Sequence, residues 1–163
     1  CATEYAAAAA SWGSEAFVDA SDDDLARVAE LSNRIAGAAD ASTGALFAAW
    51  RAMPSPDDPA EAATIALQVL RELRGGAHLS AVHAVGLGPH RAIMSVDHPV
   101  RGGAPGAERF GWQAPHPEGD PVRRAEAEEL TSRACEPAYA VLDDGEAGEF
   151  TDLVLQLRAR IDI

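Results

Sequence analysis

The chain has 163 residues, with 13 basic side chains, all of them arginine, against 26 carboxylates, and its formal net charge is −13. This length suits one domain with a sizeable core, and no apolar run approaches the roughly 20 residues that a membrane span needs. Because nucleic-acid binding draws its affinity from neutralised phosphates, the negative charge argues against a general nucleic-acid partner. We predict a cytoplasmic protein without a membrane partner.

Helix caps and periodicity predict the elements of the first half. The alanine-rich segment from Tyr5 to Trp12 has high helix propensity. Ser21 is placed to cap a helix whose apolar positions continue to residue 35. Asp58 and Pro59 predict the start of the most periodic helix, and Gly75-Gly76 predicts its end.

In the second half, two short helices are predicted at 77–85 and 89–96, separated by a glycine turn. Helix, tight turn and helix is the arrangement of a helix-turn-helix. Residues 97–121 contain five prolines and five glycines, which predicts a long loop. Helices follow from 122 and over 146–161, and the apolar face of the last one is expected either in the core or at a homodimer or heteromer surface.

Several segments together are similar to a family from GC-rich actinobacteria described as helix-turn-helix, SalK-like or EvbL-like. Its hallmark resembles the leucine-rich helix, Arg-Gly-x-x-His and Gly-Leu seen here between Leu70 and Leu87. Further similar segments lie at 45–50, 54–59, 124–131 and 137–140. The resemblance implies an all-helical, winged-helix-like fold, with the Pro/Gly loop in place of the wing.

We therefore expect an all-α fold: one helical bundle over 1–163, with a helix-turn-helix portion and the loop 97–121. Cys135 is expected as a small buried group, and Cys1 and Cys135 give no disulfide framework. His83, His90 and His98 lack the spacing of a metal site, so we predict neither a metal nor a cofactor.

Charge segregation suggests where a site would lie. All five histidines fall between His78 and His116, and residues 71–124 carry seven arginines against five acids, whereas both flanks are strongly acidic. If the helix ended at Gly75-Gly76, Arg74 and His78 could face one crevice, a combination that suits an anion. The predicted ligand-binding residues are Arg74, His78, His83 and Arg91.

Three functions remain open at this point. The first is a binding protein of specialised metabolism that holds an anionic small molecule or a partner protein, with 97–121 as a lid or docking arm. The second is a small enzyme, or a minor enzyme subunit, with His78 or His83 as acid or base. The third is a winged-helix transcriptional regulator.

Overall fold

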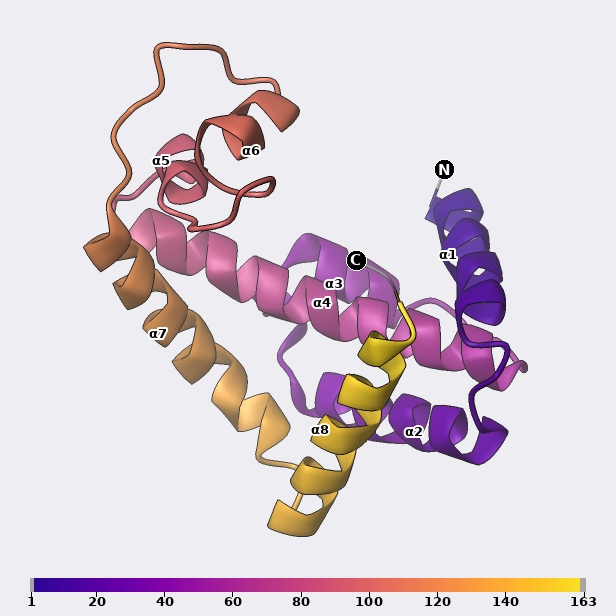
Figure 1. The fold of residues 1–163 in the computed structure, drawn as a ribbon. Coiled ribbons are helices and arrows are strands. Elements are labelled where there is room, and N and C mark those ends of the chain that lie inside the picture. The colour runs from indigo at the N-terminus through magenta and orange to yellow at the C-terminus, as the bar shows by residue number, and fades with distance from the viewer. Residues whose placement is uncertain (1, 162–163) are drawn as a thin grey trace. The chain divides into compact units, whose positions relative to one another are not determined.

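A computed structural model describes residues 2–161, and every regular element in that range is helical, as predicted (Figure 1). Cys1 lies outside the described residues. The elements are α1 (Ala2–Ala16), α2 (Asp22–Ala38), the 3₁₀ turn η1 (Ala41–Thr43), α3 (Ala45–Arg51), α4 (Pro59–Ala84), α5 (Pro89–Met94), α6 (Gly103–Arg109), α7 (Pro121–Tyr139) and α8 (Asp144–Ala159).

The chain divides into two compact units, each described here by itself. Unit 1 comprises residues 1–76 and 135–163, and unit 2 comprises residues 77–134. The two units differ in net charge. Unit 1 has seven arginines against 19 carboxylates, and unit 2 has six arginines against seven carboxylates. The expectation of a single domain stays a prediction.

The predicted starts of α2 and α4 are confirmed. The Ser21 hydroxyl caps α2 by accepting from the backbone N–H of Asp24. The Asp58 carboxylate accepts from the backbone N–H of Glu61 at 3.0 Å, and Pro59 is the first residue of α4. These side chains satisfy N–H groups that have no partner within the helix.

The predicted helix end at Gly75-Gly76 is wrong. Figure 1 shows α4 as one uninterrupted helix that runs through both glycines to Ala84. Gly76 serves close packing instead, since a Cβ built there would lie 2.7 Å from the carbonyl oxygen of Thr43 and 3.3 Å from the Cα of Gly44. A glycine can thus mark a close backbone approach as well as a turn.

The actual end of α4 is a Schellman motif at Gly86. The backbone N–H of Leu87 donates to the oxygen of Val82 at 3.1 Å, and that of Gly86 donates to the oxygen of His83 at 3.0 Å. Gly86 has a φ of 66°, in the left-handed region where only glycine is unstrained. The segments predicted as helices 59–74 and 77–85 are therefore one helix.

Two apolar clusters form the core of unit 1. The first centres on Phe47, Leu31, Ile35 and Leu73, and the second on Phe17, Leu25 and Val28. The face of α8 joins both clusters: Leu157 is buried, and Phe150 packs against each of them. Of the two roles expected for that face, burial in the core is the one observed.

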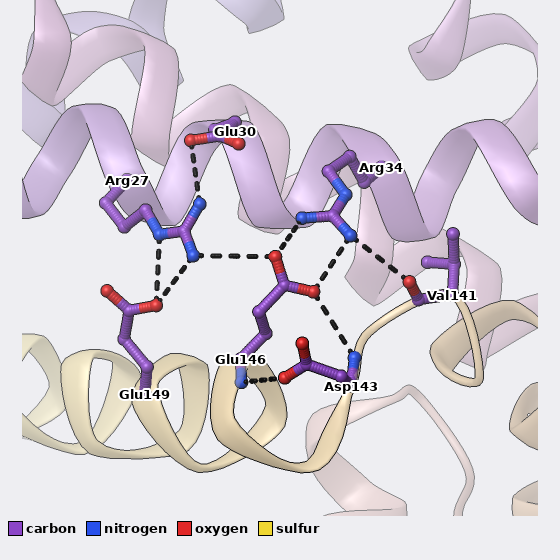
Figure 2. Close-up of polar contacts among 7 residues, drawn as sticks. All are labelled: Arg27, Glu30, Arg34, Val141, Asp143, Glu146 and Glu149. Carbon is purple, nitrogen blue, oxygen red and sulfur yellow. Dashed lines mark hydrogen bonds and ion pairs between the residues drawn. The ribbon is translucent and has the colours of Figure 1, made fainter.

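An ion-pair network joins α2 to α8, which lie side by side (Figures 1 and 2). The Arg34 guanidinium donates to both carboxylate oxygens of Glu146 and to the carbonyl oxygen of Val141. Arg27 donates to Glu149 at 2.7 Å. Glu146 also closes a capping box with Asp143 at the start of α8. The Arg34 contact, followed by the Asp143 N–H, lowers the pKa of Glu146 from 4.5 to about 2.

Acid should weaken this network. Because the folded pKa of Glu146 is depressed, its stabilising contribution is full above about pH 4.5 and is lost as the pH falls toward 2. We expect Glu146→Gln to lower the melting temperature at pH 7, and the gap from the parent protein to shrink between pH 5 and pH 2.5. Thermal denaturation across this range measures the gap.

Asp152→Asn is the matched control for that experiment. Asp152 is exposed on the same helix and forms no ion pair within residues 2–161. Its substitution should leave the melting temperature nearly unchanged at every pH. A gap for Glu146→Gln that stays constant down to pH 2.5 would contradict the assignment.

Unit 2 has a small core around Val82, Leu87 and Ala127. The prediction of one long loop over 97–121 is wrong in part, because α6 forms within it. Its glycines allow close packing around α6. A Cβ at Gly102, just before α6, would lie 2.0 Å from the oxygen of Val96, just after α5, and one at Gly106 in α6 would lie 3.1 Å from Ile93 Cγ2 in α5. In the sequence these glycines suggest a loop. In the structure they allow a helix to pack closely.

None of the helices within residues 2–161 combines the length and the apolar character that crossing a membrane requires.

Candidate functional site

A groove lies between α1 and α4 in unit 1. Its first hollow has a volume of about 490 Å³ and a mostly apolar lining. Aromatic rings from α1 line it on one side, and Thr64, Gln68 and Arg71 from α4 supply its polar groups. The full lining is Tyr5, Ala8, Ala9, Trp12, Phe17, Thr64, Leu67, Gln68, Arg71 and Ile161.

The wall of this hollow is set by a close helix crossing. A Cβ built at Gly13 of α1 would lie 2.0 Å from Thr64 Oγ1 and 2.8 Å from Thr64 Cβ. The absence of a side chain at Gly13 thus lets α1 touch α4 at this point. Tyr5 and Trp12 remain 60 % and 46 % exposed, although their rings lie edge-on to Trp50 and Phe17 respectively. Both exposed rings line the hollow, so they belong to one continuous apolar surface.

A second hollow, of about 380 Å³, adjoins the first and shares Tyr5 and Gln68 with it. The remaining lining is Leu46, Ala49, Trp50, Met53 and Glu72. Gln68 Nε2 and Arg71 Nη1 both donate to Glu72 Oε1, at 2.8 and 3.0 Å. We call the two hollows together the α1–α4 groove.

The residues predicted to bind a ligand lie elsewhere. Arg74 is exposed in unit 1. It lies close enough to Cys135 and Tyr139 for its positive charge to favour a lower pKa at both. Cys135 is buried, as predicted. Burial raises the pKa of its thiol, and the charge of Arg74 opposes that rise. Because α4 continues through Gly75-Gly76, the helix end on which the Arg74–His78 crevice depended is not there.

His78 holds two helices of unit 2 together. Its Nδ1 lies 2.9 Å from Thr131 Oγ1, and that hydroxyl donates to the carbonyl oxygen of Ala127 at 2.6 Å. A hydroxyl has one proton, so His78 Nδ1–H must be the donor to Thr131. Thr131 is buried in α7. A packed, hydrogen-bonded histidine is therefore what the structure shows here.

Arg91 and His83 take different positions in unit 2. Arg91 Nε donates to the oxygen of Glu118 at 3.1 Å, and its Nη2 lies 3.6 Å from Asp120 Oδ2, so this side chain fastens the end of segment 97–121 to α5. His83 is exposed in the last turn of α4. A ligand role for either residue stays a prediction.

The structure brings together a different pair of histidines. His90 Nε2 lies 3.1 Å from His116 Nδ1, and the His90 ring stacks on Trp112 with centroids 4.7 Å apart. His116 Nε2 is buried, 3.8 Å from Glu108 Oε1. Segment 97–121 thus packs on α5. Within residues 2–161, no group of three or more histidine, cysteine or carboxylate side chains could hold a metal ion.

Comparison with known families identifies the family of this chain. A model described as "Helix-turn-helix family" matches residues 1–119, well over half of the chain. The chain belongs to this helix-turn-helix family. In this family member, α4 and α5 flank a turn in which Gly86 and Gly88 have φ values of 66° and 72°, and Leu87 is buried beneath it. No curated protein and no solved structure matches the chain.

The groove of this helix-turn-helix protein was not predicted from its sequence. Its residues carry little charge and no histidine, so charge segregation could not reveal it. One signal was present, because Tyr5 and Trp12 stand seven residues apart in an alanine-rich helix, and positions i and i+7 share a face.

Proposed function

We propose that this helix-turn-helix family member binds an apolar small molecule in the α1–α4 groove. The observation that carries the proposal is the first hollow, with about 490 Å³ bounded largely by aromatic and aliphatic side chains. Ligand sites are commonly of this size and have a few polar groups on an apolar wall. Thr64, Gln68 and Arg71 would supply those groups.

The groove is favoured over the site first expected around Arg74, His78, His83 and Arg91. His78 and Arg91 already have protein partners that join helices of unit 2. The groove, by contrast, exposes the rings of Tyr5 and Trp12 to solvent, and covering them would remove apolar surface from water. Burial of this apolar surface would favour a ligand in the groove.

The test uses N-phenyl-1-naphthylamine, a neutral apolar probe that fluoresces strongly in apolar sites. Ala8 is exposed on α1 and lines the first hollow, so Ala8→Trp should fill it without disturbing the core. We expect the protein to enhance probe fluorescence, and Ala8→Trp to weaken probe binding by about tenfold or more. Ala7 is its neighbour, exposed and outside the lining of either hollow, which makes Ala7→Trp the matched control.

Equal probe binding by the Ala8→Trp and Ala7→Trp variants would place the probe elsewhere and contradict the proposal. Circular dichroism of both variants ensures that any loss of binding occurs in folded protein.

A transcriptional regulator is the second candidate function, and the family match favours it. Unit 2 is close to neutral, with six arginines against seven carboxylates, whereas unit 1 is strongly acidic and would oppose DNA. Electrophoretic mobility of duplex DNA at low and moderate salt tests this candidate. Retardation that weakens steeply with salt would support it.

The resemblance to SalK-like and EvbL-like proteins suggests a role in specialised metabolism. This role stays a prediction, as do catalysis by a histidine, a homodimer or heteromer, and a cytoplasmic location.

A further inference from the structure

The two hollows of the groove differ in the charge of their linings. Among residues 2–161, Arg71 is the one charged residue that lines the first hollow, and Glu72 is the one that lines the second. The exposure of the two side chains also differs: Arg71 is 70 % exposed, whereas Glu72 is only 15 % exposed. The buried charge of the groove is therefore the negative one.

The Glu72 carboxylate is held in place from one side. Gln68 Nε2 and Arg71 Nη1 both donate to Oε1. A carboxylate has two oxygens that accept hydrogen bonds, and Glu72 itself lines the second hollow. Because Arg71 points its guanidinium at Glu72, an anion drawn to Arg71 would also meet the charge of Glu72.

Two aromatic rings line the same hollow as this carboxylate. Tyr5 and Trp50 both line the second hollow, with ring centroids 5.7 Å apart and planes at 75°. Aromatic faces attract cations through the ring quadrupole, and a partly desolvated site strengthens that attraction. The seven arginines and 19 carboxylates of unit 1 add a negative potential that also favours a cation.

We propose that the second hollow selects an apolar cation, an amine whose ammonium group sits between Glu72 and the rings of Tyr5 and Trp50 while its apolar body lies in the first hollow. This inference rests on the proposed function, because it assumes that the groove binds a small molecule. It differs from the anionic ligand expected from the sequence.

The experiment compares three compounds with one apolar body: 4-phenylbutylamine, 4-phenylbutanol and 4-phenylbutyrate. Calorimetric titration at pH 7.5 and low salt gives the affinity of each for the whole protein. We expect the amine to bind about tenfold more tightly than the alcohol, and the carboxylate to bind most weakly. Glu72→Gln should weaken binding of the amine about tenfold. It should change the affinity for the alcohol by less than about twofold.

Glu61→Gln is the matched control, because Glu61 is an acid of the same helix that lines neither hollow. It should retain the preference for the amine. An equal loss in Glu61→Gln and Glu72→Gln would show that overall charge sets the preference, and would overturn the role of Glu72.

If Glu72→Gln fails to fold, the parent protein and Ala8→Trp still decide the matter. If the alcohol binds and Ala8→Trp weakens it, but the amine is not preferred, the inference is overturned and the proposed function stands. If none of the three compounds binds, the proposed function is contradicted together with the inference.

Discussion

Gly76→Ala is expected to destabilise the protein, whereas Gly75→Ala is expected to stabilise it. Within a helix, alanine is favoured over glycine by about 1 kcal/mol. Gly75 meets nothing within 4 Å of an added Cβ, so that gain should appear as a rise of about 0.5–1 kcal/mol in the free energy of unfolding. At Gly76 the Cβ would lie 2.7 Å from the backbone oxygen of Thr43, and no rotamer change can relieve a contact with backbone.

Overpacking of this kind typically costs about 1–3 kcal/mol, and after subtraction of the helix-propensity gain Gly76→Ala should lose up to about 2 kcal/mol overall. Urea denaturation of the two variants beside the parent measures both changes. A helix that ended at these glycines in the left-handed conformation would give a different outcome. Both substitutions would then destabilise, and that result would contradict a continuous α4.

The second large effect is expected at Gly13, where α1 crosses α4. An added Cβ would lie 2.0 Å from Thr64 Oγ1 and 2.8 Å from Thr64 Cβ, and the second atom is fixed to the backbone of α4. Gly13→Ala should therefore displace α1 and cost about 2–3 kcal/mol. Because α1 forms one wall of the groove, the same variant should also lose binding of N-phenyl-1-naphthylamine.

Gly148→Ala is the control for that experiment, since Gly148 lies in α8 with nothing within 4 Å of an added Cβ. It should be neutral or slightly stabilising, with probe binding unchanged. Thermal denaturation and probe fluorescence report the two effects separately. A Gly13→Ala protein that melts with the parent and binds the probe equally well would contradict the close crossing.

The parts of the fold that the sequence predicts well are those set by local interactions. The starts of α2 and α4 follow from Ser21 and Asp58, whose side chains accept from N–H groups three residues along the chain. The face of α8 follows from helical spacing, and Leu157 on that face is buried. Caps and helical spacing depend only on residues that are close together in the sequence.

Glycine caused the two errors in secondary structure for a common physical reason. A glycine either takes a positive φ or lets another backbone come close, and the sequence alone does not distinguish these uses. Gly86 has the first use, as a Schellman cap. Gly76 and Gly102 have the second, and only the positions of Thr43 and Val96 reveal it.

The sequence led to a different candidate site because the search followed titratable residues. Histidine and arginine stand out in this acidic chain, but His78 and Arg91 join helices in the structure. The groove depends on α1 packing against α4, a contact between residues some 50 positions apart such as Gly13 and Thr64. No local pattern reports that contact.

The three tryptophans of the chain provide the most direct test of a ligand site in the α1–α4 groove. Trp12 lines the first hollow, Trp50 lines the second, and Trp112 stacks on His90 in unit 2. In ¹⁵N-labelled protein, each indole N–H gives one resonance. On addition of N-phenyl-1-naphthylamine we expect the Trp12 and Trp50 resonances to shift and that of Trp112 to stay in place. A shift of Trp112 alone, or of none of the three at saturating probe, would contradict binding in the groove.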